Sequence, residues 1–454
     1  MSAHIMDSEF YQNSWSTEEM RAIFTMERRF DRWLKIEAAL ARAEAQCGFV
    51  PQEAANAITK AADIKNIDLD KLEADLAKAN HTLMPLIRQL QAVTEGNHGE
   101  YVHFGVATQD IEDTGLAQEM KEAFAIVYRD AKQAEVLLLG LAEKYKTLTM
   151  MGRTHNQHGL PTTLGLKFAG MASEMRRNIE RMKEARKRLF KCMIYGGVGT
   201  QAGLGDKAAE VSRYFAKETG LDLASTSWTN SRDTVAEYQV VLAYVCGTVS
   251  RIANEIYQLS RTEILELHEP LGENYIGSST MPHKRNAEVS EFIVCLCRIV
   301  TTNSLLGFQG MMSEHERDDR SWRLDWHGVP ESSMLTGKAL AALNFILGGI
   351  QVYENNIARN LDVLEGQIFA EAVLLHLGRK IGKQTAHQHT LEAAGVAIAK
   401  CIPFKEAILA SDALAPHISG FELDEICDYA AYTGTAAKQV EAVTAECAAL
   451  AKTD

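Results

Sequence analysis

The segment 277–286, GSSTMPHKRN, combines hydroxyls, cations and an amide, and Met281 is its only large apolar residue. Lys284 and Asn286 offer hydrogen-bond donors, and a Gly-Ser-Ser backbone can turn successive N–H groups toward one point. Such donors suit a carboxylate, or the dianion formed when a proton leaves the carbon beside one. A serine here could take that proton only if its neighbours lowered its pKa strongly. The alternative is a polar surface loop in which Thr280 or Asn286 caps the next helix.

A second candidate is the segment GRTHNQHGLP, which begins at Gly152 and holds two histidines three residues apart. On a helix His155 and His158 would share a face. Imidazoles can act as acid or base because they change charge near neutral pH. As metal ligands these two would lack a third partner nearby. A structural role is the alternative for both, and equally for His81 in the polar segment KANHTLMP.

Two further polar segments contain many titratable groups: VHFGVATQDIEDTG from Val102 and SEHERDDRSWRLDWHGVP from Ser313. Loops of this kind on a rigid scaffold are where sites tend to lie. In the second segment Trp322 and Trp326 are four residues apart, which favours a packed amphipathic helix over a solvated charge run. The arginines of that segment could still face an anionic substrate.

The composition of the 454-residue chain argues against several classes of protein. Its formal net charge of −13 disfavours nucleic acid and anionic membranes as partners. Its eight cysteines are scattered, which predicts free thiols and a reducing, cytoplasmic compartment. No signal peptide is apparent, and no uncharged apolar run approaches the ~20 residues of a membrane span. Dinucleotide-binding, phosphate-loop, Cys-x-x-Cys and Ser-His-Asp elbow motifs are missing, so chemistry without a cofactor or metal is favoured.

Apolar residues repeat at helical spacing over long stretches of the chain. One series steps by four and three along 238–259, and another runs along 164–189. Such stripes predict long helices that are buried along one face. The runs at 288–308 and 331–353 are rich in apolar residues, and the first is apolar on more than one side. Partners on several sides are therefore expected, and with them a homo-oligomer.

These patterns predict an all-α protein of three helical domains. The first domain covers residues 1–108. The second, 109–355, is a central bundle of long helices that carries the loop 277–286. The third covers residues 356–454. Alternating strand patterns with Asn-Gly or Asp-Gly turns are nearly absent from the sequence.

The segment 277–286 matches every fixed position of Gly-Ser-Ser-x-Met-Pro-x-Lys-x-Asn, the signature loop of the fumarase/aspartase superfamily. YVHFGVATQDIEDTG, MMGRTHNQHGLPTTLGLKFAG, YGGVGTQAGLG, NSRDTVAEY and SEHERDDRSW also resemble blocks of that superfamily, in its order. The resemblance covers most of the chain. It implies a homotetramer of three-domain chains whose long helices join in one bundle. It also implies active sites built by loops of three subunits, which would explain why the polar segments lie far apart in sequence.

The resemblance also implies roles for individual residues. Ser278 matches the general base of the superfamily, and His155 matches the residue that protonates or holds the leaving group. Lys284 assists as the third catalytic residue, at a carboxylate-binding position of the loop. The implied substrate-binding residues are His81, Thr108, Gln109, Thr154, Gln157, His158, Ser279, Met281, Asn286 and Arg317. No metal and no cofactor is implied.

The sequence is similar to two branches of the superfamily. NHTLMPLIRQL, HERDDRSWRLDWHGVPE and SGFELDEICDYAAYTG resemble the 3-carboxy-cis,cis-muconate cycloisomerases. His81 and His155 resemble the adenylosuccinate lyases instead, whereas the cycloisomerase branch has tryptophan at the position of His155. Ser14-Trp15 and Trp326 replace residues that hold the nucleotide in adenylosuccinate lyases, which argues against a nucleotide substrate. Ala107 and Ala287 also depart from the superfamily pattern.

We therefore expect a lyase that releases fumarate from a succinyl adduct of a small amine or thiol, such as S-(2-succino)cysteine. The substrate would be a small dicarboxylate-type molecule. The alternatives are a 3-carboxy-cis,cis-muconate cycloisomerase, an adenylosuccinate lyase, and a non-catalytic structural protein of the lens-crystallin kind. The sequence leaves open whether nitrogen, sulfur or oxygen departs.

Overall fold

The computed structural model describes residues 3–272 and 275–454, and it is mostly helical, as predicted. The chain divides into two compact units. Unit 1 comprises Met1–Ala131, Asn178–Ser250 and Ile293–Ala342. Unit 2 comprises Lys132–Arg177, Arg251–Phe292 and Leu343–Asp454. The boundaries of three domains near residues 108 and 355 stay a prediction.

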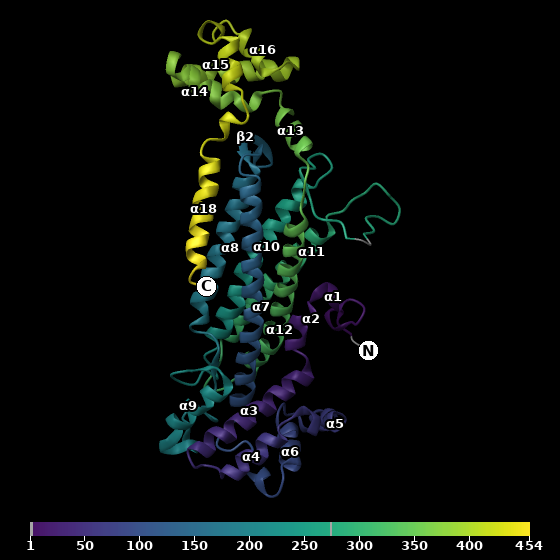
Figure 1. Cartoon of the computed structure of the whole chain (residues 1–454), viewed down its shortest axis with the longest axis vertical. Coiled ribbons are helices and arrows are strands. Elements are labelled where there is room, and N and C mark those ends of the chain that lie inside the picture. The colour runs from purple at the N-terminus through teal and green to yellow at the C-terminus, as the bar shows by residue number, and fades with distance from the viewer. Residues whose placement is uncertain (1–2, 273–274) are drawn as a thin grey trace. The chain divides into compact units, whose positions relative to one another are not determined.

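Unit 1 begins with six helices that range from 4 to 21 residues in length. They are α1 (Gln12–Trp15), α2 (Glu18–Ile23), α3 (Met26–Gln46), α4 (Gln52–Ala61), α5 (Leu69–Ala79) and α6 (Met84–Val93). α3 packs against α4 and against α9 (Ala208–Thr219), as Figure 1 shows. The hydroxyl of Thr25 and the carboxylate of Asp68 accept backbone N–H groups at the starts of α3 and α5. Such caps fix where these helices begin.

Five long helices contribute residues to both units. They are α7 (Thr108–Lys144), α8 (Leu164–Arg186), α10 (Asp233–Leu259), α11 (Glu288–Gly310) and α12 (Asp319–Gly349). The predicted apolar stripe of α10 is confirmed: its seven members, Tyr238, Leu242, Val245, Val249, Ile252, Ile256 and Leu259, are at most 2% exposed. α12 begins twelve residues before the predicted apolar run and contains Pro330.

The remaining elements are short. In unit 2 they are α13 (Glu354–Asp362), α14 (Ala370–Ile381), α15 (Lys383–Lys400), α16 (Phe404–Leu409), α17 (Gly420–Ile426) and α18 (Ala436–Ala451). α14, α15 and α16 lie together (Figure 1) around a core that includes Leu377, Phe404 and Ile408. The 3-10 helices are Ile5–Asp7, Ile64–Asn66, His98–Tyr101, Ala202–Lys207, Gln367–Phe369, Ala415–His417 and Ala431–Thr433. The parallel pair β3 (Lys191–Cys192) and β4 (Asp222–Leu223) and the antiparallel pair β5 (Leu267–His268) and β6 (Gln351–Val352) have two residues per strand.

The segment that contains His155 and His158 is a β-hairpin rather than a helix, so the two histidines do not share a helix face. β1 (Thr149–Thr154) pairs antiparallel with β2 (Gln157–Thr163), and Thr154 faces Gln157 across a two-residue turn. His155 and Asn156 have φ of 50° and 62°. Positive φ at both central residues makes a type I′ turn, whose twist matches that of a hairpin. A Cβ on Gly152, at the bulge of β1, would lie 2.7 Å from the Leu160 carbonyl.

Helix α11 is the most apolar of the long helices that the structure describes. Its length and its mean hydropathy of 1.5 would suffice for crossing a membrane, a test that core helices of soluble proteins also pass. Only 33% of the apolar window is buried within this chain. Leu305 and Phe308 on α11 are 59% and 47% exposed.

Candidate active site

The signature loop of unit 2 is closed by hydrogen bonds between its two ends. The Tyr275 hydroxyl donates to the Asn286 carbonyl (3.1 Å) and accepts from the Asn286 backbone N–H (2.5 Å). The side chain of Asn286 donates to the Gly277 carbonyl (2.7 Å). A Cβ on Gly277 would lie 2.2 Å from the Lys284 carbonyl, so only glycine fits there. Tyr275, which the sequence analysis did not identify, thus holds the loop shut.

The hydroxyl of Ser278 lies at the start of this loop and is half-buried. Its Oγ accepts the backbone N–H groups of Thr280 (3.3 Å) and Met281 (3.0 Å). Two N–H donors that point at one oxygen stabilise negative charge on it. These two N–H groups would favour the ionised form of Ser278, and its role as a general base stays a prediction.

A cavity of about 1080 Å³ opens beside the loop, within unit 2. Its lining includes Met281, Lys284 and Asn286 from the loop, and Tyr257 and Glu291 from α10 and α11. The Lys284 side chain is exposed. An anion bound in this cavity would therefore lie near Lys284, one of the cations predicted for the site.

The end of α11 next to the loop is capped by a residue distant in sequence. The carboxylate of Glu269 accepts the N–H groups of Val289 (2.9 Å) and Ser290 (2.8 Å) and the Ser290 hydroxyl (2.7 Å). Neither Thr280 nor Asn286 has this role, so the cap expected under the alternative of a polar surface loop is wrong. A carboxylate is well suited to the position because a helix N-terminus favours negative charge.

The hairpin turn presents His155 at its exposed tip, between the exposed side chains of Thr154 and Gln157. Below the tip, Arg153 donates to both oxygens of buried Glu266, at 2.7 and 2.9 Å. Asn360 donates to the same carboxylate at 2.8 Å.

His158 lies across the hairpin from Arg153 and is half-buried. Burial, and then the charge of Arg153, lower the pKa of His158, whereas Glu266 opposes this. His158 is therefore held neutral, and its buried Nδ1 has no partner among the described residues.

In unit 1, the start of α7 is organised by Asp110. Its carboxylate accepts the backbone N–H groups of Ala107 (2.8 Å), Tyr195 (2.7 Å) and Gly196 (2.9 Å). Burial raises the pKa of Asp110, and these three N–H groups and the charge of Arg317 oppose the rise. Half-buried Thr108 and exposed Arg317 thus belong to the same unit, close to one end of α7.

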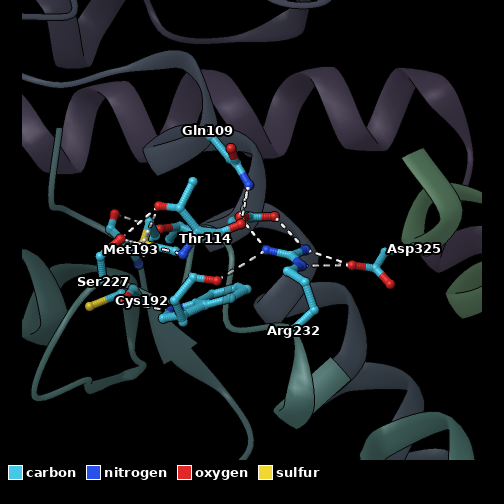
Figure 2. Close-up of polar contacts among 10 residues, drawn as sticks. Gln109, Thr114, Cys192, Met193, Ser227, Arg232 and Asp325 are labelled. Carbon is cyan, nitrogen blue, oxygen red and sulfur yellow. Dashed lines mark hydrogen bonds and ion pairs between the residues drawn. The ribbon is translucent and has the colours of Figure 1, made fainter. Parts of the chain in front are cut away.

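Gln109 lies inside a buried polar network of unit 1. Its side chain, 1% exposed, donates to Asp113 (2.9 Å) and to the Thr229 carbonyl (3.1 Å). Arg232 donates to both oxygens of Asp113, at 2.7 and 3.0 Å, and to Asp325 at 2.8 Å. Figure 2 shows Gln109, Arg232 and Asp325 joined through this network. Both amide hydrogens of Gln109 are therefore engaged, and its predicted contact with a substrate stays a prediction.

His81 lies at the start of α6, where its Nδ1 accepts the N–H groups of Leu83 (3.3 Å) and Met84 (3.1 Å). An acceptor at Nδ1 assigns the neutral ring with a proton on Nε2, which makes His81 a donor. His103, absent from the predicted set, contacts buried Glu37 at 2.7 Å. Burial lowers the pKa of His103, but contact with Glu37 and the charges of Asp110 and Glu112 together raise it.

The predicted site residues fall into both units. His81, Thr108, Gln109 and Arg317 belong to unit 1, and His155, His158, Ser278 and Lys284 to unit 2 together with Thr154, Gln157, Ser279, Met281 and Asn286. Within unit 2 the structure brings Met281, Lys284 and Asn286 to one cavity. No group of three His, Cys, Asp or Glu side chains in the described parts of the chain could hold a metal ion. The catalytic roles of all these residues stay predictions.

Comparison with known proteins places the chain in a family. A family model described as "Lyase" matches residues 12–301, and one described as "Adenylosuccinate lyase C-terminus" matches residues 366–443. The chain belongs to this lyase family. It is a fumarate-releasing lyase of the fumarase/aspartase superfamily, so the expected superfamily and enzyme class are confirmed. Membership in the lyase family implies a small dicarboxylate substrate.

Two curated relatives match this chain over nearly its whole length. The N-acetyl-S-(2-succino)cysteine lyase of Enterococcus italicus is 40% identical, covering 98% of this chain and 98% of the relative. Its namesake in Dickeya dadantii is 37% identical, with coverages of 98% and 97%. Among solved structures, the 3-carboxy-cis,cis-muconate lactonizing enzyme from Pseudomonas putida matches with a TM-score of 0.92. It is 31% identical, and the match covers 98% of this chain and 100% of that chain.

Proposed function

We propose that this lyase releases fumarate from a succinyl thioether of a cysteine, with N-acetyl-S-(2-succino)cysteine as the leading substrate. The observation that carries the proposal is similarity, over 98% of the chain, to two relatives of that name. The local environment of Ser278 adds support, since two N–H groups point at its oxygen. A thioether also agrees with the expectation, drawn from the sequence, of a succinyl adduct of a small thiol.

In the proposed reaction Ser278, as the alkoxide, takes a proton from the succinyl carbon next to a carboxylate. The electron pair left on that carbon forms the new C=C bond, and the adjacent C–S bond breaks with its electron pair going to sulfur. His155 donates a proton to the departing thiolate. Lys284 stabilises the dianion that precedes elimination. The products are fumarate and a thiol, and the proton on Ser278 then passes through solvent to His155, which restores both groups without consuming a cofactor or an oxidant.

One alternative has support of its own. The match to a 3-carboxy-cis,cis-muconate lactonizing enzyme, with a TM-score of 0.92, favours a cycloisomerase. His155 argues against it, because the cycloisomerase branch has tryptophan at this position. The argument against adenylosuccinate lyase stands on Ser14, Trp15 and Trp326, none of which supplies the positive charge that a nucleotide phosphate needs.

We further propose that the enzyme is a cytoplasmic homotetramer whose sites combine loops of three subunits. Large apolar side chains of the long helices support this, since Val136, Tyr244, Leu305 and Phe345 are 51–60% exposed in the single chain. Exposed apolar surface of this kind is typical of interaction sites, and a second copy of the chain would bury it. The eight cysteines are free thiols, which agrees with a reducing compartment.

Proton NMR of the purified enzyme with a panel of succinyl compounds tests the proposal. The panel holds N-acetyl-S-(2-succino)cysteine, S-(2-succino)cysteine, argininosuccinate, adenylosuccinate and 3-carboxymuconate. We expect the fumarate vinyl signal from the S-succinyl compounds, and no signal with Ser278→Ala. If lactone formed from 3-carboxymuconate and no adduct gave fumarate, the proposal would fail and the enzyme would be a cycloisomerase.

A further inference from the structure

The hairpin that carries His155 is packed at its base and exposed at its tip. At the base, Met151 of β1 belongs to a buried apolar cluster with Leu361 of α13 and Phe369. At the tip, the side chains of residues 154–157 are exposed, and among residues 3–272 and 275–454 they form no hydrogen bond or ion pair. Arg153 is therefore the last residue of β1 whose side chain ties the hairpin to the rest of unit 2.

The carboxylate that binds Arg153 is itself fixed from several directions. Arg153 donates to both oxygens of Glu266, at 2.7 and 2.9 Å, and the two side chains are 15% and 0% exposed. Asn360 of α13 donates to the same carboxylate at 2.8 Å, and the Tyr353 N–H donates to the Glu266 carbonyl at 2.9 Å. A planar guanidinium that holds both oxygens of a carboxylate is fixed in orientation as well as in distance. The pair therefore sets the direction in which the last residues of β1 run toward His155.

Glu266 begins a buried segment, 266–269, that has contacts on several sides within unit 2. Leu267 and His268 form β5, which pairs with β6. The Nε2 of His268 lies 3.4 Å from the Arg285 carbonyl in the signature loop. The carboxylate of Glu269 caps α11. The hairpin is thus tied through Arg153 to a well-anchored part of the unit, and not to another exposed loop.

We propose that Arg153, held by Glu266, is a positioning residue that fixes the hairpin tip so that His155 reaches the departing thiolate. The inference rests on the proposed function, in which His155 donates a proton to that thiolate. Arg153 does not touch the substrate and acts only through His155. Because a proton donor must lie within hydrogen-bond reach of its acceptor, a tip displaced by about 1 Å can cost up to about 100-fold in rate.

A double-mutant cycle with N-acetyl-S-(2-succino)cysteine as the substrate tests the inference. Arg153→Lys keeps the positive charge but loses the planar fork that grips both oxygens of Glu266. We expect it to lower kcat about 10- to 100-fold while KM stays within about threefold of wild type. In enzyme that already carries His155→Gln, the same change should lower kcat less than about threefold, because the donor that Arg153 positions is gone. Glu266→Gln breaks the pair from its other side and should repeat both results.

Arg176→Lys is the matched control, because it makes the same change in another buried arginine–glutamate pair of unit 2. The Nε of Arg176 donates to Glu135 at 2.6 Å, and the two side chains are 3% and 4% exposed. This pair joins α8 to α7 and has no residue in the hairpin. Arg176→Lys should leave kcat within about threefold of its parent, with or without His155→Gln. A thermal melt of each variant shows that it is folded.

The possible results separate the inference from the proposed function. If Arg153→Lys lowered kcat equally with and without His155, or if Arg176→Lys cost as much as Arg153→Lys, the inference would be overturned while the proposed function stands. If His155→Gln left kcat unchanged, the role of His155 and the inference would both fail, although fumarate release would stand. If the wild type released no fumarate, the proposed function itself would be refuted.

Discussion

The predicted site residues of unit 2 are exposed or half-buried, whereas Gln109 of unit 1 is buried. In unit 2, His155 and Lys284 are exposed on loop tips, and Ser278 is half-buried in the loop 277–286. In unit 1, Gln109 lies in a fully buried network with Asp113 and Arg232. The difference indicates that the groups predicted to react in unit 2 are accessible, whereas the buried network of unit 1 ties Asp113 on α7 to Asp325 on α12 through Arg232. Changes in unit 2 should therefore reduce activity, and changes in the network should reduce stability.

The largest effect is expected from Ser278→Ala in unit 2. Loss of the proposed general base should reduce kcat about 10³-fold or more. The Ser278 hydroxyl accepts only local N–H groups of the loop, so the thermal midpoint should stay within about 2 °C of wild type. Steady-state kinetics and a thermal melt of the same preparation check both parts. A variant that lost its fold together with its activity would contradict the expectation that changes in unit 2 reduce activity rather than stability.

Arg232→Met should have the opposite outcome in unit 1. The change leaves the carboxylates of Asp113 and Asp325 buried without their partner, which costs about 3–5 kcal/mol of folding free energy. Urea unfolding measures the loss. Arg42→Gln, which breaks an exposed pair with Glu218 of 2.8 Å in the same unit, is the control and should cost less than about 1 kcal/mol. Equal effects of the two changes would show that burial does not decide the outcome.

The pH dependence of stability gives a third test. Burial, and then the charge of Glu37, raise the pKa of Glu44 to about 9 from 4.5. Above pH 4.5 the unfolded state loses the proton that the folded state retains, so this carboxyl destabilises the fold increasingly up to about pH 9. Glu44→Gln should therefore raise the thermal midpoint at pH 8 by several degrees, and much less at pH 5. A gain that did not depend on pH would show that Glu44 is ionised in the folded protein.

The smallest expected effect comes from Tyr275→Phe, which removes both contacts of the hydroxyl with Asn286. A looser signature loop should lower kcat about tenfold, because a tenfold change in rate corresponds to the free energy of one or two hydrogen bonds. The thermal midpoint should change by about 1 °C or less. Tyr432→Phe, which removes one hydroxyl contact with Glu371 elsewhere in unit 2, is the control and should leave kcat unchanged.

Much of the helical framework could be predicted from the sequence because helix packing depends on local spacing of apolar residues. The stripe along α10 shows this, since its apolar residues at steps of four and three are buried. The polar composition of 277–286 likewise predicted a loop. The hairpin at His155 was missed because neither alternating apolar residues nor an Asn-Gly turn marks it. Its two positive φ angles arise at His155 and Asn156, residue types that adopt them less readily than glycine.

Other features depend on contacts between residues far apart in sequence. The cap of α11 comes from Glu269, about twenty residues away, and no local motif indicates it. The pair of Arg153 and Glu266 spans 113 positions. Such contacts follow from the tertiary fold, so the sequence identified the chemistry of the site more readily than the residues that hold it in place.

The most direct test of fumarate release from a cysteine thioether is its stoichiometry. Wild-type enzyme is incubated with N-acetyl-S-(2-succino)cysteine, fumarate is followed by its vinyl proton signal, and free thiol is titrated in the same samples. We predict that fumarate and thiol appear together in a ratio of about one, as elimination across a single C–S bond requires. Fumarate without thiol, or neither product at any enzyme concentration, would contradict the account.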